Sequence, residues 1–270
     1  MDNQDIKIFS FHYKPGSVVT DDPLYIPIFS GKNGSKNTSQ ITGDDTGENI
    51  SSRNLYYSEL TGIYWVWKNQ HADTIGSCHY RRFFTAKPEP LSYRAKRILF
   101  YLIGLNRKRY GLIYTNNVER FRKAILTKNE ILEILKSHDA IFPQRRKFRY
   151  SVKEHYRRYH DLRDLEIIAM ILCEKYPEYL PSFNSVMNGN RLYANNMFIL
   201  KKANYEQFMA WWFDILFEFE SRINKADYKG YQQRIMGFIA ERLLTIWVDH
   251  QNLRIKELQV IYFKKLKKLN

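Results

Sequence analysis

With 270 residues, the chain is long enough for one large domain or two small ones with a substantial buried core. Its formal net charge of +15 leaves three classes of partner open: nucleic acid, an anionic membrane and phosphorylated small molecules. Two cysteines, Cys78 and Cys173, form no metal-binding spacing and exclude a disulfide framework. Aromatic residues make up 16% of the chain, a high share that is common in proteins that stack on flat or sugar-like ligands.

The start of the chain carries no targeting signal. Residues 1–5 lack the positive and apolar parts of a signal peptide. The most apolar run, residues 98–105, is far too short to span a bilayer. We therefore expect a cytoplasmic protein.

The first part of the chain reads as strands, a long loop and a helix. Alternating and β-branched residues predict strands at Ile6–His12 and Tyr25–Phe29. Residues 30–50 are rich in Gly, Ser, Asn and Asp, which predicts a long loop of the kind that is often functional. Within it, the pair Asp44 and Asp45 fits either a divalent ion or, more commonly, a turn whose carboxylates accept hydrogen bonds from a sugar. Apolar residues at helical spacing predict a helix over residues 55–68, with Glu59 at the edge of its apolar face.

Residues 73–84 carry the strongest functional signal. The first half is a short apolar run typical of a buried strand, and His79, Arg81 and Arg82 follow where that strand emerges. Ligands of open α/β sheets bind beyond the carboxyl ends of strands, and two arginines there offer bidentate donors for a diphosphate. The alternative is a solvated basic turn.

The middle of the chain has a different composition. Residues 93–110 alternate Arg and Lys with apolar residues, a pattern that suits either a membrane surface or a packed helix with its cations in water. Lys128–Ser137 is predicted to be a helix with a capping box made by Thr127 and Glu130. A buried strand is predicted at residues 139–143.

Helices at residues 152–158 and 162–173 bring together several titratable side chains. His160 and Asp161 fit a general-base pair, and they fit equally well a helix cap and a surface pair. Residues 192–200 are predicted to form a strand whose adjacent amides, Asn195 and Asn196, need buried partners or sugar hydroxyls. Further helices are expected at residues 205–221, capped by Asn204, and at residues 231–248. Residues 259–270 are expected to form a strand and a basic, partly mobile end.

The order of elements argues for an α/β protein with a mixed sheet. No Gly-rich loop of the dinucleotide or Walker type occurs, which argues against an NAD enzyme or a P-loop NTPase. No basic and aromatic module of a known nucleic-acid fold occurs either.

Several motifs in order resemble the domain-of-unknown-function family 4422. They are residues 12–14, 44–51, 59–61, 64–69, 78–84, 196–198 and 237–244, and the resemblance spans nearly the whole chain. This family is associated with capsule and O-antigen loci and with galactofuranosyltransferases of the GT-A type. The resemblance implies one GT-A-like domain over residues 1–270, with a Rossmann-like mixed sheet flanked by helices and a helical C-terminal part. Beyond the family core we expect a basic helical insertion at about residues 91–137 and a basic tail at residues 259–270.

The resemblance also implies a function. The chain is expected to transfer galactofuranose or another hexose from a UDP-sugar to a capsular, O-antigen or other cell-surface polysaccharide. The competing class is a non-catalytic basic module that binds nucleic acid or another polyanion, supported only by the net charge.

Roles for individual residues follow as predictions. The general base is expected to be Asp161 with His160, and Glu241 is the second choice. Sugar or acceptor contacts are assigned to Asn195, Asn196 and Glu59. Donor nucleotide and diphosphate contacts are assigned to His12, Lys14, Asp44, Asp45, Asn49, His79, Arg81 and Arg82.

GT-A enzymes usually carry an Asp-x-Asp motif for a metal where this chain has His79-Tyr80-Arg81. Because guanidinium groups neutralise a diphosphate but cannot ligate a cation, we expect no metal requirement, although Asp44 and Asp45 leave a divalent ion open. The expected partners are a UDP-sugar, a lipid-linked or polysaccharide acceptor and the anionic inner face of the membrane, reached by residues 93–110 and the lysines at positions 264, 265, 267 and 268. Nucleic acid is not expected, and no oligomeric state is predicted.

Overall fold

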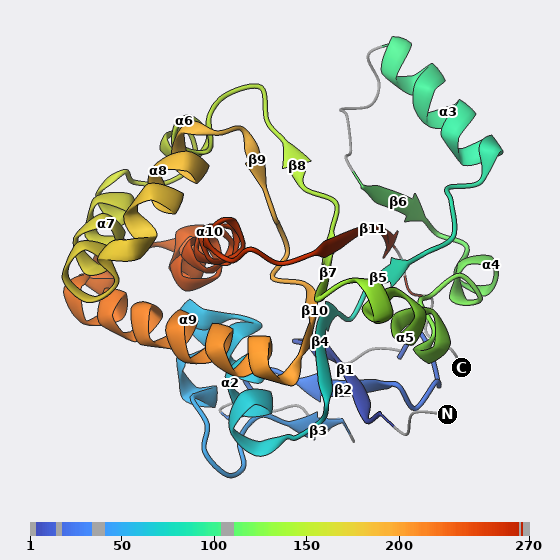
Figure 1. Cartoon of the computed structure of the whole chain (residues 1–270), viewed down its shortest axis with the longest axis horizontal. Coiled ribbons are helices and arrows are strands. Elements are labelled where there is room, and N and C mark those ends of the chain that lie inside the picture. Colours follow the sequence, from blue (N-terminus) through green and yellow to red (C-terminus); the bar gives the residue numbers. More distant parts are fainter. Residues whose placement is uncertain (1–3, 15–17, 34–40, 104–110, 265, 267–270) are drawn as a thin grey trace.

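A computed structural model describes residues 4–14, 18–33, 41–103, 111–264 and 266 (Figure 1). Its centre is a mixed sheet of nine strands. These strands are β1 (Ile6–His12), β2 (Tyr25–Phe29), β3 (Thr42–Gly43), β4 (Thr74–His79), β5 (Arg82–Thr85), β6 (Leu112–Thr115), β7 (Ala140–Pro143), β10 (Phe198–Lys201) and β11 (Ile255–Phe263). A separate two-stranded sheet joins β8 (Arg146–Lys147) to β9 (Arg191–Leu192).

Helices lie on both sides of this sheet (Figure 1). They are α1 (Asn54–Tyr57), α2 (Leu60–Asn69), α3 (Leu91–Leu102), α4 (Val118–Arg122), α5 (Lys128–Ser137), α6 (Val152–Arg157), α7 (Arg163–Lys175), α8 (Leu180–Asn188), α9 (Lys202–Arg222) and α10 (Ile235–His250). Short 3-10 turns occur at Ser51–Arg53, Pro177–Tyr179, Lys225–Asp227 and Gly230–Arg234. The α/β class with a mixed sheet is therefore confirmed.

The sheet buries a different core on each face. Along β1, Ile8 packs into one cluster with Phe121 and Ile131, whereas Phe9 and Phe11 pack into the other, which holds α2 and α7–α10. Successive side chains of a strand point to opposite faces, so the alternation of β1 sets this division. Helices cover both faces, which explains why the central strands β1 and β4 are buried along nearly their whole length.

The predictions for β1, β2 and α5 are confirmed within a residue. Thr127 accepts a hydrogen bond from the Glu130 backbone N–H, and Glu130 returns one to Thr127, which completes the predicted capping box. Residues 73–84 form two strands rather than one. β4 and β5 are antiparallel and pair through His79 and Arg82.

Three boundaries were predicted wrongly for local reasons. The helix over residues 55–68 is broken at Ser58, whose φ of 53° ends α1 before α2 begins. Asn204 caps nothing, because α9 begins at Lys202 and its N-cap, Lys201, has no side-chain cap hydrogen bond. The helix predicted over residues 231–248 starts as a 3-10 turn and becomes α-helical at Ile235.

The strand predicted over residues 192–200 is interrupted where its two asparagines lie. Asn195 and Asn196 have φ values of 81° and 50°, which no strand allows, and only residues 191–192 and 198–201 are extended and paired. Asparagine tolerates the left-handed region better than most residues, so the adjacent amides mark a turn rather than a strand interior.

Two further corrections concern the insertion and the tail. Residues 91–137 are not wholly helical, because β6 joins the central sheet beside β11. Residues 259–263 are not a tail: β11 is nine residues long and pairs with β7 through its first half and with β5 and β6 through its second half. Most of the basic end, at positions 265 and 267–270, and residues 104–110 lie outside the described residues.

Candidate functional site

The order of strands reverses at β1. β2 and β3 follow on one side of β1, and the chain then crosses over to place β4 on the other side, all four strands being parallel. In open α/β sheets, ligands bind in the crevice that such a reversal creates beyond the carboxyl ends of the strands. β1 and β4 end here in two histidines, His12 and His79.

A cavity of about 550 Å³ opens beyond these strand ends. It brings together seven of the residues predicted from the sequence: Glu59, His79, Arg81, Arg82, His160, Asn195 and Glu241. A smaller cavity of about 300 Å³ adjoins it and shares Tyr13, Glu59, His79 and Arg234. Phe11, His12 and Leu55 also line this smaller cavity.

The larger cavity is strongly basic. Its lining includes two glutamates, Glu59 and Glu241, and five arginines, Arg81, Arg82, Arg146, Arg234 and Arg242. Five guanidinium groups less two carboxylates leave an excess of three positive charges when the histidines are neutral. Such a concave, positively charged surface concentrates anions.

Arg81 and Arg82 are held by aromatic rings. The guanidinium carbons of Arg81 and Arg82 lie 5.5 Å and 5.0 Å from the ring centroid of Tyr262, and Arg81 lies 4.8 Å from that of Tyr80. Arg81 also donates a hydrogen bond to the carbonyl of Lys264 at 3.3 Å. The buried Nε of each arginine has no hydrogen-bond partner among the described residues, so both retain donors for a ligand.

Four histidines near the two cavities are uncharged at neutral pH. Burial lowers the pKa of His12 to about 4, and burial followed by the charge of Arg242 lowers the pKa of His155 to about 4. Burial, reinforced by Arg82 and Arg81, holds the pKa of His79 well below its ordinary value. The pKa of His160 is also lowered by burial. The positive charge of the site therefore comes from its arginines, while each imidazole offers one N–H donor and one acceptor.

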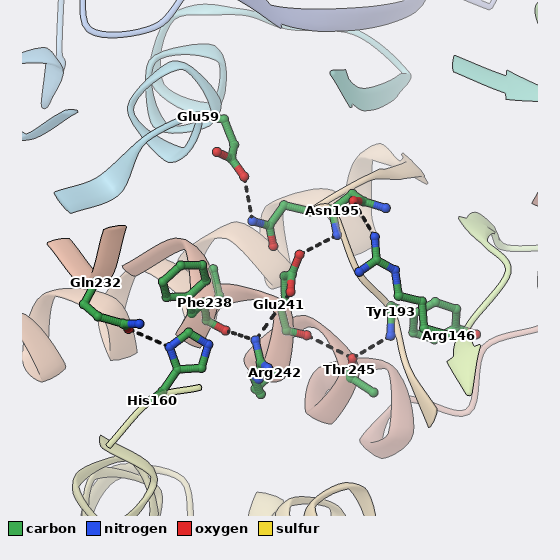
Figure 2. A network of polar contacts seen from close by, with 12 residues as sticks. Glu59, Arg146, His160, Tyr193, Asn195, Gln232, Phe238, Glu241, Arg242 and Thr245 are labelled. Atoms are coloured by element: carbon green, nitrogen blue, oxygen red, sulfur yellow. Dashed lines mark hydrogen bonds and ion pairs between the residues drawn. The ribbon is translucent and has the colours of Figure 1, made fainter. Parts of the chain in front are cut away.

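Glu241 of α10 faces the turn that carries Asn195 (Figure 2). Its Oε1 accepts a hydrogen bond from the Asn195 backbone N–H at 2.7 Å, and the left-handed conformation of Asn195 belongs to this turn. Its Oε2 lies 3.4 Å from a terminal nitrogen of Arg242. The side chain of Glu241 is 22% exposed, so the carboxylate stays open to the cavity.

Arg242 is a buried cation, with a residue exposure of only 3%. It donates to the carbonyl of Phe238 at 2.9 Å (Figure 2). Its guanidinium carbon lies 4.9 Å from the ring centroid of Tyr156. Burial lowers its pKa, and Glu241 opposes that shift. A guanidinium this deep beside the cavity floor needs anionic compensation, and Glu241 provides part of it.

Glu59 joins two distant parts of the chain. Its Oε1 accepts from the side-chain amide of Asn196 at 3.1 Å, and its Oε2 lies 3.3 Å from Arg234. Arg234 in turn donates to the hydroxyl of Ser58 at 2.8 Å. The break between α1 and α2 at Ser58 thus places the start of α2 against the Asn195 turn.

Asp161, the first choice for the general base, does not line the larger cavity. Its carboxylate forms an ion pair with Arg163 at 2.6 Å, which lowers its pKa, and it faces an adjacent hollow. His160 lines both spaces, and its Nδ1 lies 2.8 Å from Oε1 of Gln232. His160 and Asp161 were predicted as a pair because they are adjacent in sequence, but only His160 lines the larger cavity.

The loop residues assigned to the donor also lie elsewhere. Asp44 is fully buried, and its carboxylate accepts from the backbone N–H groups of Gly31 and Lys32 and from the hydroxyl of Ser51 at 2.5–3.0 Å. Direct donor contact does not fit Asp44, because it lines neither cavity and its oxygens already hold the loop.

Asp45 is exposed, Asn49 bonds within its own loop to Gly47, and neither of them lines either cavity. Lys14 is exposed beside the ring of Tyr13, outside both cavities, and Asn196 contributes through Glu59.

Sequence reasoning missed three arginines of the site. Arg146 lies in β8, where its NH2 group donates to Oδ1 of Asn195 at 3.3 Å, while Arg234 and Arg242 belong to the C-terminal helices. The sequence signal for Arg242 was that it falls, with Glu241, within the family motif at residues 237–244. Their convergence depends on the packing of α10 against the sheet.

The site offers little to a metal ion. Within the described ranges, no three His, Cys, Asp or Glu side chains are grouped so as to hold one.

Among the helices of the described residues, none is long and apolar enough to cross a bilayer.

Comparison with known proteins bears on the whole chain. The apo structure of the bifunctional glycosyltransferase WbbM superposes with a TM-score of 0.84 at 28% sequence identity. The match covers 98% of this chain and 48% of WbbM, so the chain spans about half the length of that protein. No curated protein matches. The model of the family described as Domain of unknown function (DUF4422) matches residues 7–252, and the chain therefore belongs to the DUF4422 family.

Proposed function

We propose that this protein is a glycosyltransferase that moves a sugar from a nucleoside diphosphate donor to a saccharide acceptor. The observation that carries the proposal is the arginine-lined cavity at the reversal of the strand order, with two carboxylates in its wall. This reaction requires positive charge that stabilises the anionic leaving group and a carboxylate or similar group that accepts the proton of the acceptor hydroxyl. The similarity to WbbM, whose name describes a bifunctional glycosyltransferase, supports the same conclusion.

The donor would occupy both cavities. The smaller cavity, with Phe11, Tyr13 and His12, fits a flat nucleobase and its ribose. Arg81 and Arg82 would bind the diphosphate through charge-assisted hydrogen bonds, which neutralises the charge that develops as the sugar leaves. The neutral ring of His79, which lines both cavities, would add one hydrogen bond where the nucleoside joins the diphosphate.

Glu241 is the group that we assign as general base. An acceptor hydroxyl oxygen would form a bond to the anomeric carbon, the bond from that carbon to the diphosphate oxygen would break, and Glu241 would take the hydroxyl proton. Glu241 is partly open to the cavity, whereas Asp161 is paired with Arg163 outside it. Glu59 and Asn195 would contact sugar hydroxyls.

The finer assignments rest on family resemblance. We propose a GT-A type enzyme that uses UDP-galactofuranose or another UDP-hexose and extends a capsular, O-antigen or similar surface polysaccharide. No divalent metal is required in this scheme, because the arginines carry the electrostatic task that a metal performs elsewhere.

A donor panel tests the proposal. The full-length chain is incubated with a series of UDP-sugars, and UDP release and binding are measured. We expect saturable binding of UDP and turnover with one or a few sugars. Arg81→Ala should raise the Kd for UDP at least tenfold, since a charge-assisted hydrogen bond contributes about 1.5–3 kcal/mol.

Arg191→Ala is the matched control for this experiment, because Arg191 is exposed in β9 and lines neither cavity. It should leave UDP affinity unchanged. Turnover should also survive EDTA. Failure of every donor to bind would overturn the proposal, and loss of turnover in EDTA that Mn²⁺ restores would overturn its metal-free form.

A further inference from the structure

Helix α3 presents an unusual surface. Five of the seven exposed Leu, Ile and Met side chains of the described residues lie in it or directly after it, at Leu91, Ile98, Leu99, Leu102 and Ile103. Leu91 is 80% and Leu102 is 74% exposed. Large apolar side chains that gather in one exposed place mark a contact surface, whereas single ones need no explanation.

The apolar side chains form a stripe. Leu91, Ala95, Ile98, Leu99 and Leu102 follow the helical spacing that puts them on one face, and all five are exposed. The opposite face contacts the protein through Tyr93, which packs against Phe121 with ring centroids 5.0 Å apart. In Figure 1, α3 lies at the periphery of the molecule, beyond β6 and away from the other helices.

The sequence of this segment is rich in basic residues, and the acidic residue next to it, Glu89, precedes α3 and lines a cavity with Lys96. Residues 91–110 contain six basic residues and no acidic residue. Arg94 and Lys96 are exposed on α3 itself. An apolar stripe flanked by Arg and Lys is the pattern of a helix that lies in the headgroup region of a bilayer.

We propose that α3 is a membrane-docking helix, which lies along the surface of a bilayer that contains anionic lipids and buries its apolar stripe between the headgroups. Twelve residues of helix are about 18 Å long, enough to lie in the interface but too short to span it. The basic residues bind the anionic headgroups, and each one near such a surface raises the partition coefficient about fivefold.

A second copy of the chain fits this face less well. Pairing two α3 helices through their stripes would bring two acid-free basic segments together, and like charges at close range repel. A bilayer offers apolar depth and negative charge at the same place. The same repulsion argues against a basic protein partner.

Docking would also orient the molecule. A cavity of about 660 Å³ lies behind α3 and is lined by Lys96, Tyr114 and Lys264. The carbonyl of Lys264 accepts the hydrogen bond from Arg81, which links the lining of this cavity to that of the arginine-lined cavity. Under the proposed function, a membrane-bound acceptor would reach the donor from this side.

The test is co-sedimentation of the full-length chain with vesicles. One set contains phosphatidylcholine alone, and the other contains phosphatidylcholine with phosphatidylglycerol. The chain should sediment with the anionic vesicles only. The double variant Leu99→Glu, Leu102→Glu should lower the partition coefficient at least tenfold, and Arg94→Gln, Lys96→Gln should lower it also.

The control is Met170→Glu, which places a new carboxylate at the exposed Met170 on α7. It should leave binding close to the unmodified level. Unfolding temperatures of all variants show whether they fold. A second readout is an environment-sensitive dye on Leu99→Cys in a Cys173→Ser background, where the remaining Cys78 is buried; its emission should shift to the blue with anionic vesicles.

Several outcomes would overturn the proposal. These are equal binding to both vesicle types, binding to neither, or anionic binding that the α3 substitutions do not weaken. Self-association in solution that Leu99→Glu, Leu102→Glu abolishes would assign the stripe to a second copy instead. None of these results depends on turnover, so the proposal can fail while the proposed function stands.

Discussion

At the scale of single residues, the partners of a carboxylate decide whether it can act as a general base. Asp161 and Glu241 are both acidic, but an adjacent Arg163 neutralises Asp161 outside the larger cavity, whereas Glu241 faces the cavity with one oxygen held by a backbone N–H. The geometry needed for proton abstraction therefore favours the residue that sequence reasoning ranked second.

This difference gives a direct prediction. Glu241→Gln keeps the shape of the side chain and the hydrogen bond from Asn195 but removes the base, so kcat should fall about 100-fold or more with little change in donor affinity. Asp161→Asn is the matched control and should keep kcat within about twofold. Steady-state kinetics with the accepted donor measures both. The reverse pattern would move the base to the hollow beside His160.

At the scale of elements, one buried carboxylate joins a strand to a loop. Asp44 follows β3, and its bonds to Gly31 and Lys32 fix the chain after β2, beside the smaller cavity that Ser30 lines. Asp44 therefore ties the chain after β2 to the chain after β3, whereas the carboxylate of the next residue, Asp45, is exposed.

Asp44→Asn should destabilise the protein by about 1–3 kcal/mol, because the new amide N–H groups face a backbone donor and leave it unpaired. Asp45→Asn should change the free energy of unfolding by less than about 0.5 kcal/mol. Chemical denaturation measures both. An unchanged stability of Asp44→Asn together with a large loss of donor affinity would restore Asp44 as a donor ligand.

At the scale of the whole molecule, buried histidines make stability depend on pH. His12 is 1% exposed, and burial lowers its pKa from 6.5 to about 4. Between these values the unfolded chain binds a proton that the folded chain does not, so the contribution of His12 to stability is complete above about pH 6.5 and declines as the pH falls towards 4.

Lowering the pH from about 7.5 to about 5 should cost about 2 kcal/mol through His12 alone. His12→Asn should remove this part of the pH dependence, whereas His71→Asn, at an exposed position, should retain it. Denaturation at the two pH values measures the difference. An equal loss of stability in the unmodified chain and in His12→Asn would contradict the assignment.

Net charge sets a further contrast at this scale. Binding of a nucleic acid through many phosphates should weaken steeply and log-linearly with salt, whereas a single diphosphate in the arginine-lined cavity releases few counterions. We expect UDP affinity to fall less than tenfold between about 0.05 M and about 0.2 M salt. Binding of a nucleic acid that weakens a thousandfold or more over the same salt range would favour the polyanion-binding alternative.

The sequence by itself determined the class of fold and the ends of several elements, and it pointed to the candidate site. Short-range signals sufficed for these: alternation predicted β1 and β2, and Thr127 and Glu130 capped α5. A buried strand followed by His79, Arg81 and Arg82 predicted an anion site, and these three residues line the larger cavity. Each depends on residues a few positions apart.

Only the tertiary structure decided which distant residues share the cavity. Glu59 meets Asn196 across 137 positions, and β11 lies between β7 and β5 in the sheet, a position that no local pattern in its sequence predicted. The positive φ of Asn195 and Asn196 likewise fits the contacts of Glu59 and Glu241 with this turn rather than the local strand pattern. Periodicity predicts which face of an element is buried, but not which element it packs against, because that choice depends on the shape and charge of the whole assembly of elements.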